Sequence, residues 1–352
     1  MNKNSRIVEF DILKGLGIIC VIAGHIAQNY DNQKIMQIFY SFHMPLFFII
    51  SGYFVSTRKN IKDFCVSRAC KILKAYVVAC VGVIAGRTLI CYVKYRTGVL
   101  ALREAFKWIY ISIYGIGNGK GSIYIDSQLQ ICHTDEIGML WFLLALLWAQ
   151  CLVRMFLKFS ERKCCLLVLI TTIVGLVSVN YIWFPFSIQN GMAATIWIYI
   201  GYRIKILQLM DNACYSNRKN AVIIVCIIIW AISILWGQTE LYKNYYKLGL
   251  LDMGGALAGC IVLFWSIKKV IEFSQINSKC TSYFVWVGRN SILFYIVHYW
   301  EQKISPNNTV ALLTNRYIGI NKLLDFFISV GLITLICTGA VRSYELLISR
   351  KL

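Results

Sequence analysis

A succession of long apolar runs along the chain limits its possible folds more than any other sequence feature. A helix needs about 20 mostly apolar residues to cross a bilayer, and ten runs approach or reach that length. Only 15% of the 352 residues are charged, whereas a soluble domain carries about 25%, so lipid must be the main solvent. We therefore expect an all-α, polytopic bundle of about ten transmembrane helices. The runs are 12–28, 35–55, 75–93, 138–157, 165–182, 187–206, 221–236, 248–267, 289–300 with extensions at both ends, and 323–341.

The loops between these runs alternate in positive charge. The N-terminus, the second, fourth, sixth and eighth loops and the C-terminus together hold twenty-two Lys and Arg residues. The short loops on the opposite side, which are the first, fifth, seventh and ninth, hold six. Because Lys and Arg gather in cytoplasmic loops, this bias places both termini in the cytoplasm. The long third loop obeys that rule poorly, and its segment 101–113 is a candidate interfacial helix. No repeat is visible, so we expect one membrane-embedded domain over residues 1–352 without a soluble appendage.

Composition also narrows the classes of function. The net charge of +20 is explained by membrane topology, so it does not predict nucleic-acid binding. The 14 Cys are scattered and mostly apolar in context, which favours small packing residues over a zinc or disulfide framework. The chain contains no GxGxxG, P-loop, GxSxG or HExxH motif, and we expect no metal.

The first run contains polar residues at positions that suggest chemistry. Asp11 and Lys14 are three residues apart and can pair near the inner boundary of the membrane. Lys14 and His25 share one helix face, separated by about 16 Å of rise, and Asp11 lies close to that face. Polar residues within a span are functional candidates. His25 can therefore act as a general base in a dry pocket, or serve as a hydrogen-bonded packing residue.

Three further patterns carry candidate residues. His43 precedes Pro45, so it can cap freed backbone groups or line the same site as His25. Arg68, Lys71 and Lys74 form a basic helical stripe, which suits phosphate binding or simple anchoring at the inner face. In the ninth run, a polar stripe at helical spacing would face the bundle interior, and it consists of Ser291, Tyr295 and His298.

Taken in order, these stretches resemble the membrane acyltransferase family 3, most closely its fucose 4-O-acetylase-like branch. The family's Arg/Lys-x10-His pattern matches Lys14 and His25, and its paired basic residues match Arg68 and Lys71. Lys at position 71 keeps the charge but loses the bidentate fork of Arg. The remaining matches are Asp11–Gly15, Phe42–Phe48, Ser51–Tyr53, Leu140–Leu146 and Gly288–His298, which include Ser51, Trp141 and Asn290.

The resemblance implies transfer of an acyl group, most simply acetyl, from cytoplasmic acetyl-CoA to a hydroxyl of a cell-surface or lipid-linked carbohydrate. Arg68, Lys71 and Lys74 would bind the CoA phosphates, and the pantetheine arm would pass Lys14 toward His25. His25 would act as a general base or carry the acyl group, with Lys14 and Asp11 assisting. The implied pocket-lining residues are His43, Ser51, Trp141, Asn290, Ser291, Tyr295 and His298, with Asn290, Ser291 and Tyr295 as possible oxyanion donors.

The resemblance also implies a multi-pass protein of a bacterial plasma membrane, in contact with lipid, as a monomer or a homodimer. Two other functions fit a polytopic chain. A transporter or flippase would use intramembrane His, Lys and Asp as a proton relay, but the repeated halves common in transporters are missing. An inactive scaffold in a glycan-assembly complex would have no reason to keep both basic and histidine patterns.

Overall fold

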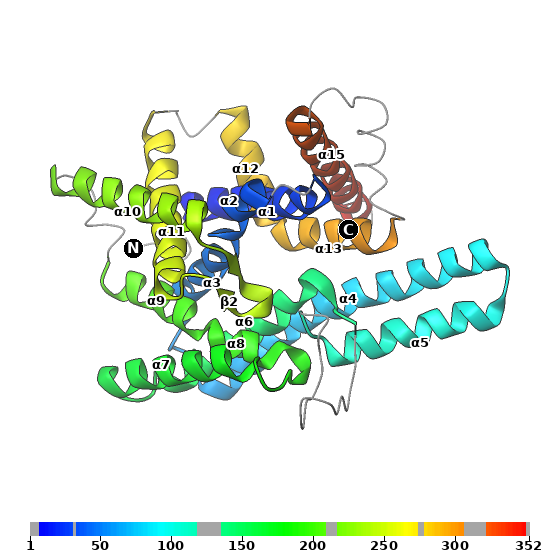
Figure 1. Ribbon diagram of the computed structural model, residues 1–352, viewed down its shortest axis with the longest axis horizontal. Helices are drawn as coiled ribbons and strands as arrows, with labels where there is room; N and C mark the ends of the chain where they lie inside the picture. Colours follow the sequence, from blue (N-terminus) through cyan, green and yellow to red (C-terminus); the bar gives the residue numbers. More distant parts are fainter. Residues whose placement is uncertain are drawn as a thin grey trace. The chain divides into compact units, whose positions relative to one another are not determined.

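The structure, a computed structural model, describes residues 7–30, 33–117, 135–208, 217–273, 278–305 and 322–349. These residues are mostly helical (Figure 1), and the only sheet among them is a two-stranded hairpin. The α-helices are α1 Val8–Ala27, α2 Gln33–Tyr40, α3 His43–Tyr53, α4 Ile61–Tyr95, α5 Gly98–Tyr114, α6 Trp141–Phe156, α7 Glu161–Ser178, α8 Ile188–Ala193, α9 Thr195–Ile206, α10 Asn217–Trp236, α11 Leu250–Phe273, α12 Lys279–Arg289, α13 Ser291–Ile304 and α15 Lys322–Ser349. The strands are β1 Thr239–Glu240 and β2 Tyr245–Tyr246.

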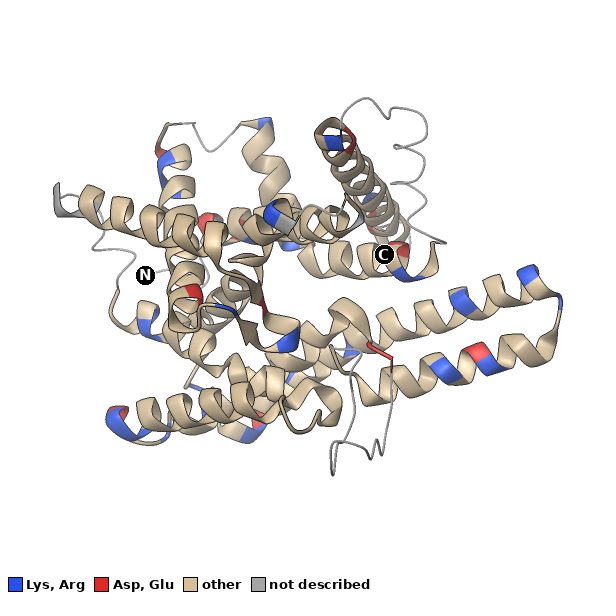
Figure 2. Ribbon diagram, viewed as in Figure 1, with Lys and Arg blue, Asp and Glu red and all other residues tan. Residues whose placement is uncertain are grey.

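Six helical segments of the described chain are long and apolar enough to cross a membrane. They are Val8–Ala27, Lys34–Tyr53, Ile61–Tyr95, Gly138–Phe156, Leu250–Phe273 and Lys322–Ser349. Charged residues gather toward helix ends; in α11, for example, residues 253–267 carry none (Figure 2). The protein is therefore a multi-pass membrane protein.

Three of the expected spans are each divided into two helices. The run 35–55 becomes α2 and α3, the run 187–206 becomes α8 and α9, and the ninth run becomes α12 and α13. Apolar patterning alone cannot locate such breaks. A proline and hydrogen bonds from side chains account for the first and the third of them.

The break between α2 and α3 follows from Pro45. Proline has no N–H to donate to the carbonyl four residues earlier, here that of Ser41. Nδ1 of His43 instead bonds the Phe39 carbonyl at 2.6 Å, and the Ser41 hydroxyl donates to the Ile38 carbonyl at 2.8 Å. His43 thus caps a carbonyl at the end of α2, whereas the carbonyl that Pro45 leaves without its helical donor is that of Ser41.

The break in the ninth run lies at Asn290, whose φ of −101° and ψ of 13° depart from helical values. The Asn290 side chain donates to the Trp286 carbonyl at 3.2 Å and to Glu345 of α15 at 2.9 Å. An Asn side chain competes well with the backbone for such bonds, so it suits the end of α12. Glu345 also accepts from the Trp286 indole, which ties α12 to α15.

The contacts divide the chain into two compact units. Unit 1 comprises residues 1–47, 215–239 and 246–352, and unit 2 comprises residues 48–214 and 240–245. In unit 1, α1 packs against α2, α11, α12, α13 and α15. The backbones of α1 and α12 lie very close together. A Cβ added at Gly15 would overlap the Phe284 carbonyl, and one added at Gly288 would overlap the Asp11 carbonyl. Small residues permit such backbone contact between membrane helices.

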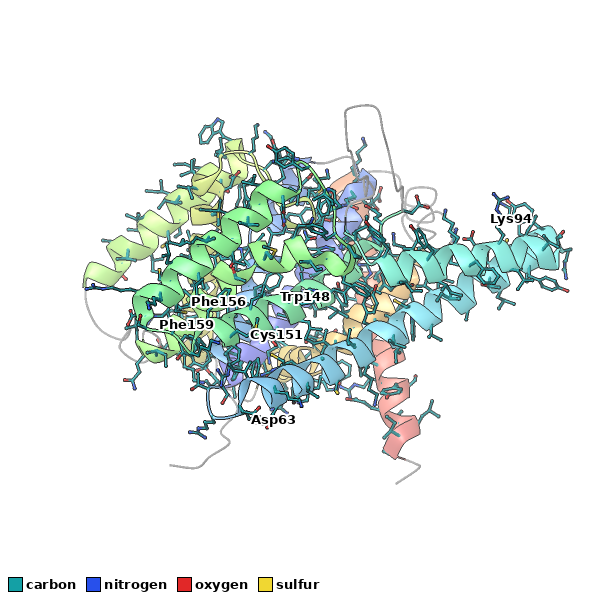
Figure 3. The ribbon with its side chains drawn as sticks, turned by 90° about the horizontal axis from the view of Figure 1, so that it is seen from below. Asp63, Lys94, Trp148, Cys151, Phe156 and Phe159 are labelled. Atoms are coloured by element: carbon teal, nitrogen blue, oxygen red, sulfur yellow. The ribbon has the colours of Figure 1, made fainter. Side chains whose placement is uncertain are left out.

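In unit 2, the longest helix is α4, and Figure 3 labels Asp63 and Lys94 near its two ends. Its 35 residues span about 52 Å, which exceeds the hydrocarbon thickness of a bilayer. The segment expected as an interfacial helix, 101–113, lies within α5, which is helical as predicted but packs along α4 (Figure 1). An ion pair of 3.0 Å between Arg87 and Glu104 joins the two helices.

Candidate active site

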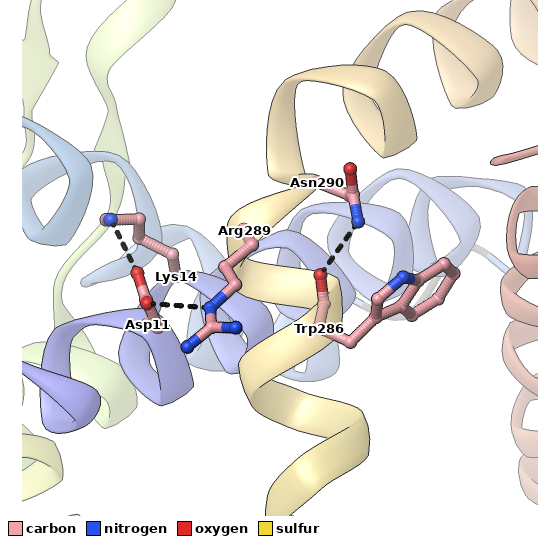
Figure 4. A network of polar contacts seen from close by, with 5 residues as sticks. All are labelled: Asp11, Lys14, Trp286, Arg289 and Asn290. Atoms are coloured by element: carbon pink, nitrogen blue, oxygen red, sulfur yellow. Dashed lines mark hydrogen bonds and ion pairs between the residues drawn. The ribbon is translucent and has the colours of Figure 1, made fainter. Parts of the chain in front are cut away.

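The N-terminal end of α1 holds a carboxylate shared by two cations. Asp11 is only 6% exposed, and the expected pair with Lys14 forms at 3.0 Å. Arg289, at the end of α12, reaches the other carboxylate oxygen at 3.3 Å (Figure 4). The contact with Arg289 was not predicted, because it joins residues far apart in the sequence. The close glycine contact between α1 and α12 makes it possible.

His25 lies toward the other end of α1, within a cluster of polar and aromatic side chains. Its Nδ1 is 3.3 Å from the Tyr40 hydroxyl and 3.4 Å from Nε2 of Gln302. Nε2 of Gln28 donates to the Tyr40 oxygen at 2.8 Å. One imidazole nitrogen therefore has orienting groups from α2 and α13, an arrangement that suits a histidine used as a base.

His43 and His298 belong to the same cluster. The His298 ring centroid lies 5.8 Å from that of His25, and the Tyr40 ring lies 5.1 Å from His43. His43 is thus both the backbone cap described above and a neighbour of the His25 cluster through Tyr40. Both interpretations of His43 are compatible, because one ring nitrogen suffices for the cap.

The stripe expected in the ninth run lies on α13 and mostly faces inward. Tyr295 and His298 are buried and Ser291 is half-buried. Asn290 precedes the helix, and its amide is engaged by Trp286 and Glu345. Glu301, one turn beyond His298, has a carboxylate oxygen 3.3 Å from Nδ1 of His298. Glu301 was not predicted as a site residue, although its three-residue spacing from His298 is visible in the sequence.

The basic stripe lies on α4 in unit 2. Lys71 and Lys74 are exposed, and Arg68 is half-buried, with its guanidinium 5.2 Å from the Phe64 ring centre. Asn60 caps this end of the helix by accepting from the Asp63 N–H at 2.7 Å. The expectation that the three basic residues share one helix is confirmed, and that helix begins well before the predicted span.

Neighbouring elements of unit 2 hold the segment that leads into the stripe. Arg154 of α6 is buried and donates to the carbonyls of Thr57 and Lys59, at 3.3 and 2.6 Å. Arg154 therefore positions the segment at the start of α4. Of the other predicted residues here, Ser51 is half-buried on α3 and Trp141 is buried at the first position of α6.

Comparisons with known proteins indicate the class of protein. The family model described as an acyltransferase domain matches residues 7–342, nearly the whole chain. Nodulation protein NolL from Sinorhizobium fredii (strain NBRC 101917 / NGR234) is 43% identical over 70 residues, which cover 18% of this chain and 19% of that protein. The match thus spans about a fifth of the relative's length. No solved structure matches. The extent of the family match shows that this chain belongs to the membrane acyltransferase family 3 and is an acyltransferase.

Proposed function

We propose that the protein transfers an acetyl group from acetyl-CoA to a hydroxyl of a cell-surface or lipid-linked carbohydrate. The observation that carries this proposal is the position of His25, inside the membrane helix α1, with Tyr40 and Gln302 at its Nδ1. An oriented imidazole in a site shielded from water can take a proton from a hydroxyl as that oxygen attacks a thioester. The acyltransferase family match supplies the class of reaction.

Each group of residues then has its own task. His25 serves as the general base or forms a transient acyl-imidazole, and Asp11 holds Lys14 and Arg289 in place at the inner end of α1. The stripe of Arg68, Lys71 and Lys74 binds the CoA phosphates, because exposed cations on one helix face match a polyanion. In this proposal, further side chains line the pocket or donate to the oxyanion, and they are His43, Ser51, Trp141, Asn290, Ser291, Tyr295 and His298.

The proposal includes a topology of ten spans in a bacterial plasma membrane, with both termini in the cytoplasm and the whole chain acting as one membrane domain. Three native cysteines offer a test, since Cys70, Cys165 and Cys280 are exposed beside basic helix starts. In variants that retain one of them, a membrane-impermeant maleimide should label inverted vesicles and leave intact cells unlabelled. Labelling of intact cells would contradict the topology.

The function is tested by transfer of radiolabel from [acetyl-14C]acetyl-CoA to envelope glycan, in membranes that contain the wild type or the His25→Ala variant. We expect label in base-labile ester linkage with the wild type alone. Thermal stabilisation of both proteins by CoA would show that the variant is folded and binds the donor. Full transfer by His25→Ala would refute the role of His25, whereas glycan movement without label and without a CoA effect would favour a transporter.

A further inference from the structure

His298 is a buried histidine whose ring nitrogens make no hydrogen bond within the described part of the chain. The residue is 1% exposed, and both Nδ1 and Nε2 are without a hydrogen-bond partner. Leaving a buried polar group in this state is costly, so such groups are rare and often functional. Its ring lies 5.8 Å from His25, inclined by 50°. The unsatisfied ring therefore adjoins the proposed base.

A carboxylate lies beside this ring. Oε2 of Glu301 is 3.3 Å from Nδ1 of His298, close enough for an ion pair although the angle is outside that of a hydrogen bond. The two residues are one turn apart on α13, and the Glu301 side chain is only 14% exposed. Water screens such a contact only weakly, because both side chains are largely buried.

His25 has different surroundings. Its Nδ1 faces the neutral groups of Tyr40 and Gln302, and the nearby titratable groups are His43, His298 and Lys303. Cys337 of α15 is a further titratable group near Glu301. The ring of His298, with the Glu301 carboxylate beside it, is thus placed to receive a proton taken up by His25.

We propose that His298 and Glu301 form a second proton-transfer site, which receives the proton from His25 and delivers it to the sulfur of CoA. This inference rests on the proposed function. The acceptor oxygen forms its bond to the acyl carbon as the C–S bond breaks, and the hydroxyl proton passes to His25, then to His298, and finally to the departing thiolate. The products are the ester and CoA thiol, and both histidines return to their neutral forms.

The leaving group explains why a second site is useful. A thiol has a pKa of about 8.5 in water, and a thiolate released in a desolvated site is costlier still. Protonation of the sulfur prevents the thiolate from attacking the new ester. A histidine with its own carboxylate can hold that proton until the sulfur departs, while His25 stays neutral for the next hydroxyl.

The test uses the full-length protein and the label-transfer assay with wild type, His298→Gln and Glu301→Gln. We expect His298→Gln to lower kcat about 100-fold and Glu301→Gln about 10-fold, with the KM for acetyl-CoA unchanged. Glu272→Gln is the matched control, because Glu272 is an exposed residue paired with Lys269 at the end of α11. It should keep the wild-type rate.

Chemical rescue separates proton transfer from a structural role. Added imidazole should restore several-fold of the lost rate to His298→Ala, because it can occupy the vacated volume and carry the proton. CoA-dependent thermal stabilisation checks that each variant is folded, and if the His298 variants fail this check, Glu301→Gln decides the question. Wild-type kcat in His298→Gln or Glu301→Gln, or a lack of imidazole rescue, would overturn the inference. An absence of label with the wild type would instead reject the proposed function.

Discussion

The histidine cluster of unit 1 and the basic stripe of unit 2 are built in opposite ways. His25 and its neighbours Tyr40, Gln302 and His298 come from α1, α2 and α13, and Tyr40 and Gln302 both reach Nδ1 of His25 from other helices. The basic stripe comes from one helix, and Lys71 and Lys74 extend into the surroundings. The cluster is held by tertiary contacts, whereas the stripe follows from local helix geometry.

This difference separates two requirements of the proposed reaction. A group that moves protons must keep a fixed orientation, and several helices are needed to restrain one ring. A surface that binds the phosphates of a flexible donor needs charge more than fixed geometry. Changes in the cluster should therefore alter kcat, and changes in the stripe should alter the KM for acyl-CoA.

The largest expected effect is on the cluster. His25→Gln should lower kcat by about 10²- to 10⁴-fold, the usual contribution of general acid–base catalysis, with little change in donor binding. Single-turnover label transfer and CoA-dependent thermal stabilisation measure the two quantities separately. If the His25 variant lost donor binding but kept its single-turnover rate, the assignment of catalysis to the cluster and of donor binding to the stripe would be wrong.

On the stripe, Arg68→Gln combined with Lys71→Gln should raise the KM for acetyl-CoA by about 10- to 100-fold, because a hydrogen bond to a charged group contributes about 1.5–3 kcal/mol. The kcat at saturating donor should stay near that of the wild type. Measuring KM at two salt concentrations checks the electrostatic origin, since added salt should weaken the wild type more than the variant.

The same stripe permits a gain-of-function test. Lys71→Arg should lower the KM for acetyl-CoA several-fold, because the guanidinium can bind phosphate through two parallel hydrogen bonds. Initial rates over a range of donor concentrations provide the measurement. An unchanged KM would show that Lys71 contributes only a diffuse charge or none.

A smaller effect is expected for Tyr40→Phe. The hydroxyl that faces Nδ1 of His25 and accepts from Gln28 would be lost, while the ring packing against His43 would remain. One such hydrogen bond contributes about 0.5–1.5 kcal/mol, so kcat should fall about 2- to 12-fold at constant KM. Tyr110→Phe on α5, an exposed tyrosine in the other unit, is the control. Equal rates for both variants would exclude Tyr40 as an orienting group.

The smallest effect concerns stability. Asp11→Asn removes the negative charge shared by Lys14 and Arg289, whose side chains are 28% and 47% exposed. Such partly exposed pairs contribute up to about 1 kcal/mol each, so the melting temperature should fall by only a few degrees. Thermal unfolding in detergent measures this shift. An unchanged melting temperature would mean that water solvates Lys14 and Arg289 as well as the Asp11 carboxylate does.

The sequence predicts best what depends on neighbours along the chain. The apolar runs predict where most helices lie, and three-residue spacing predicts the pair of Asp11 and Lys14 as well as the helical stripe on α4. The break at Ser41–Phe42 has a local cause in Pro45, whereas the break at Asn290 also involves a bond to Glu345, which no local pattern contains. Tyr40 and Gln302 were missed for the same reason, because they meet His25 across helices.

The glycine contact between α1 and α12 has a mechanical consequence. With the Asp11 and Phe284 carbonyls against the opposite backbone, neither helix can rotate or slide past the other without a steric clash. Any movement that admits a substrate must therefore carry α1 and α12 together, as a rigid pair. His25 and Arg289 would keep their relative positions throughout a catalytic cycle, and the changes in shape would have to come from other helices.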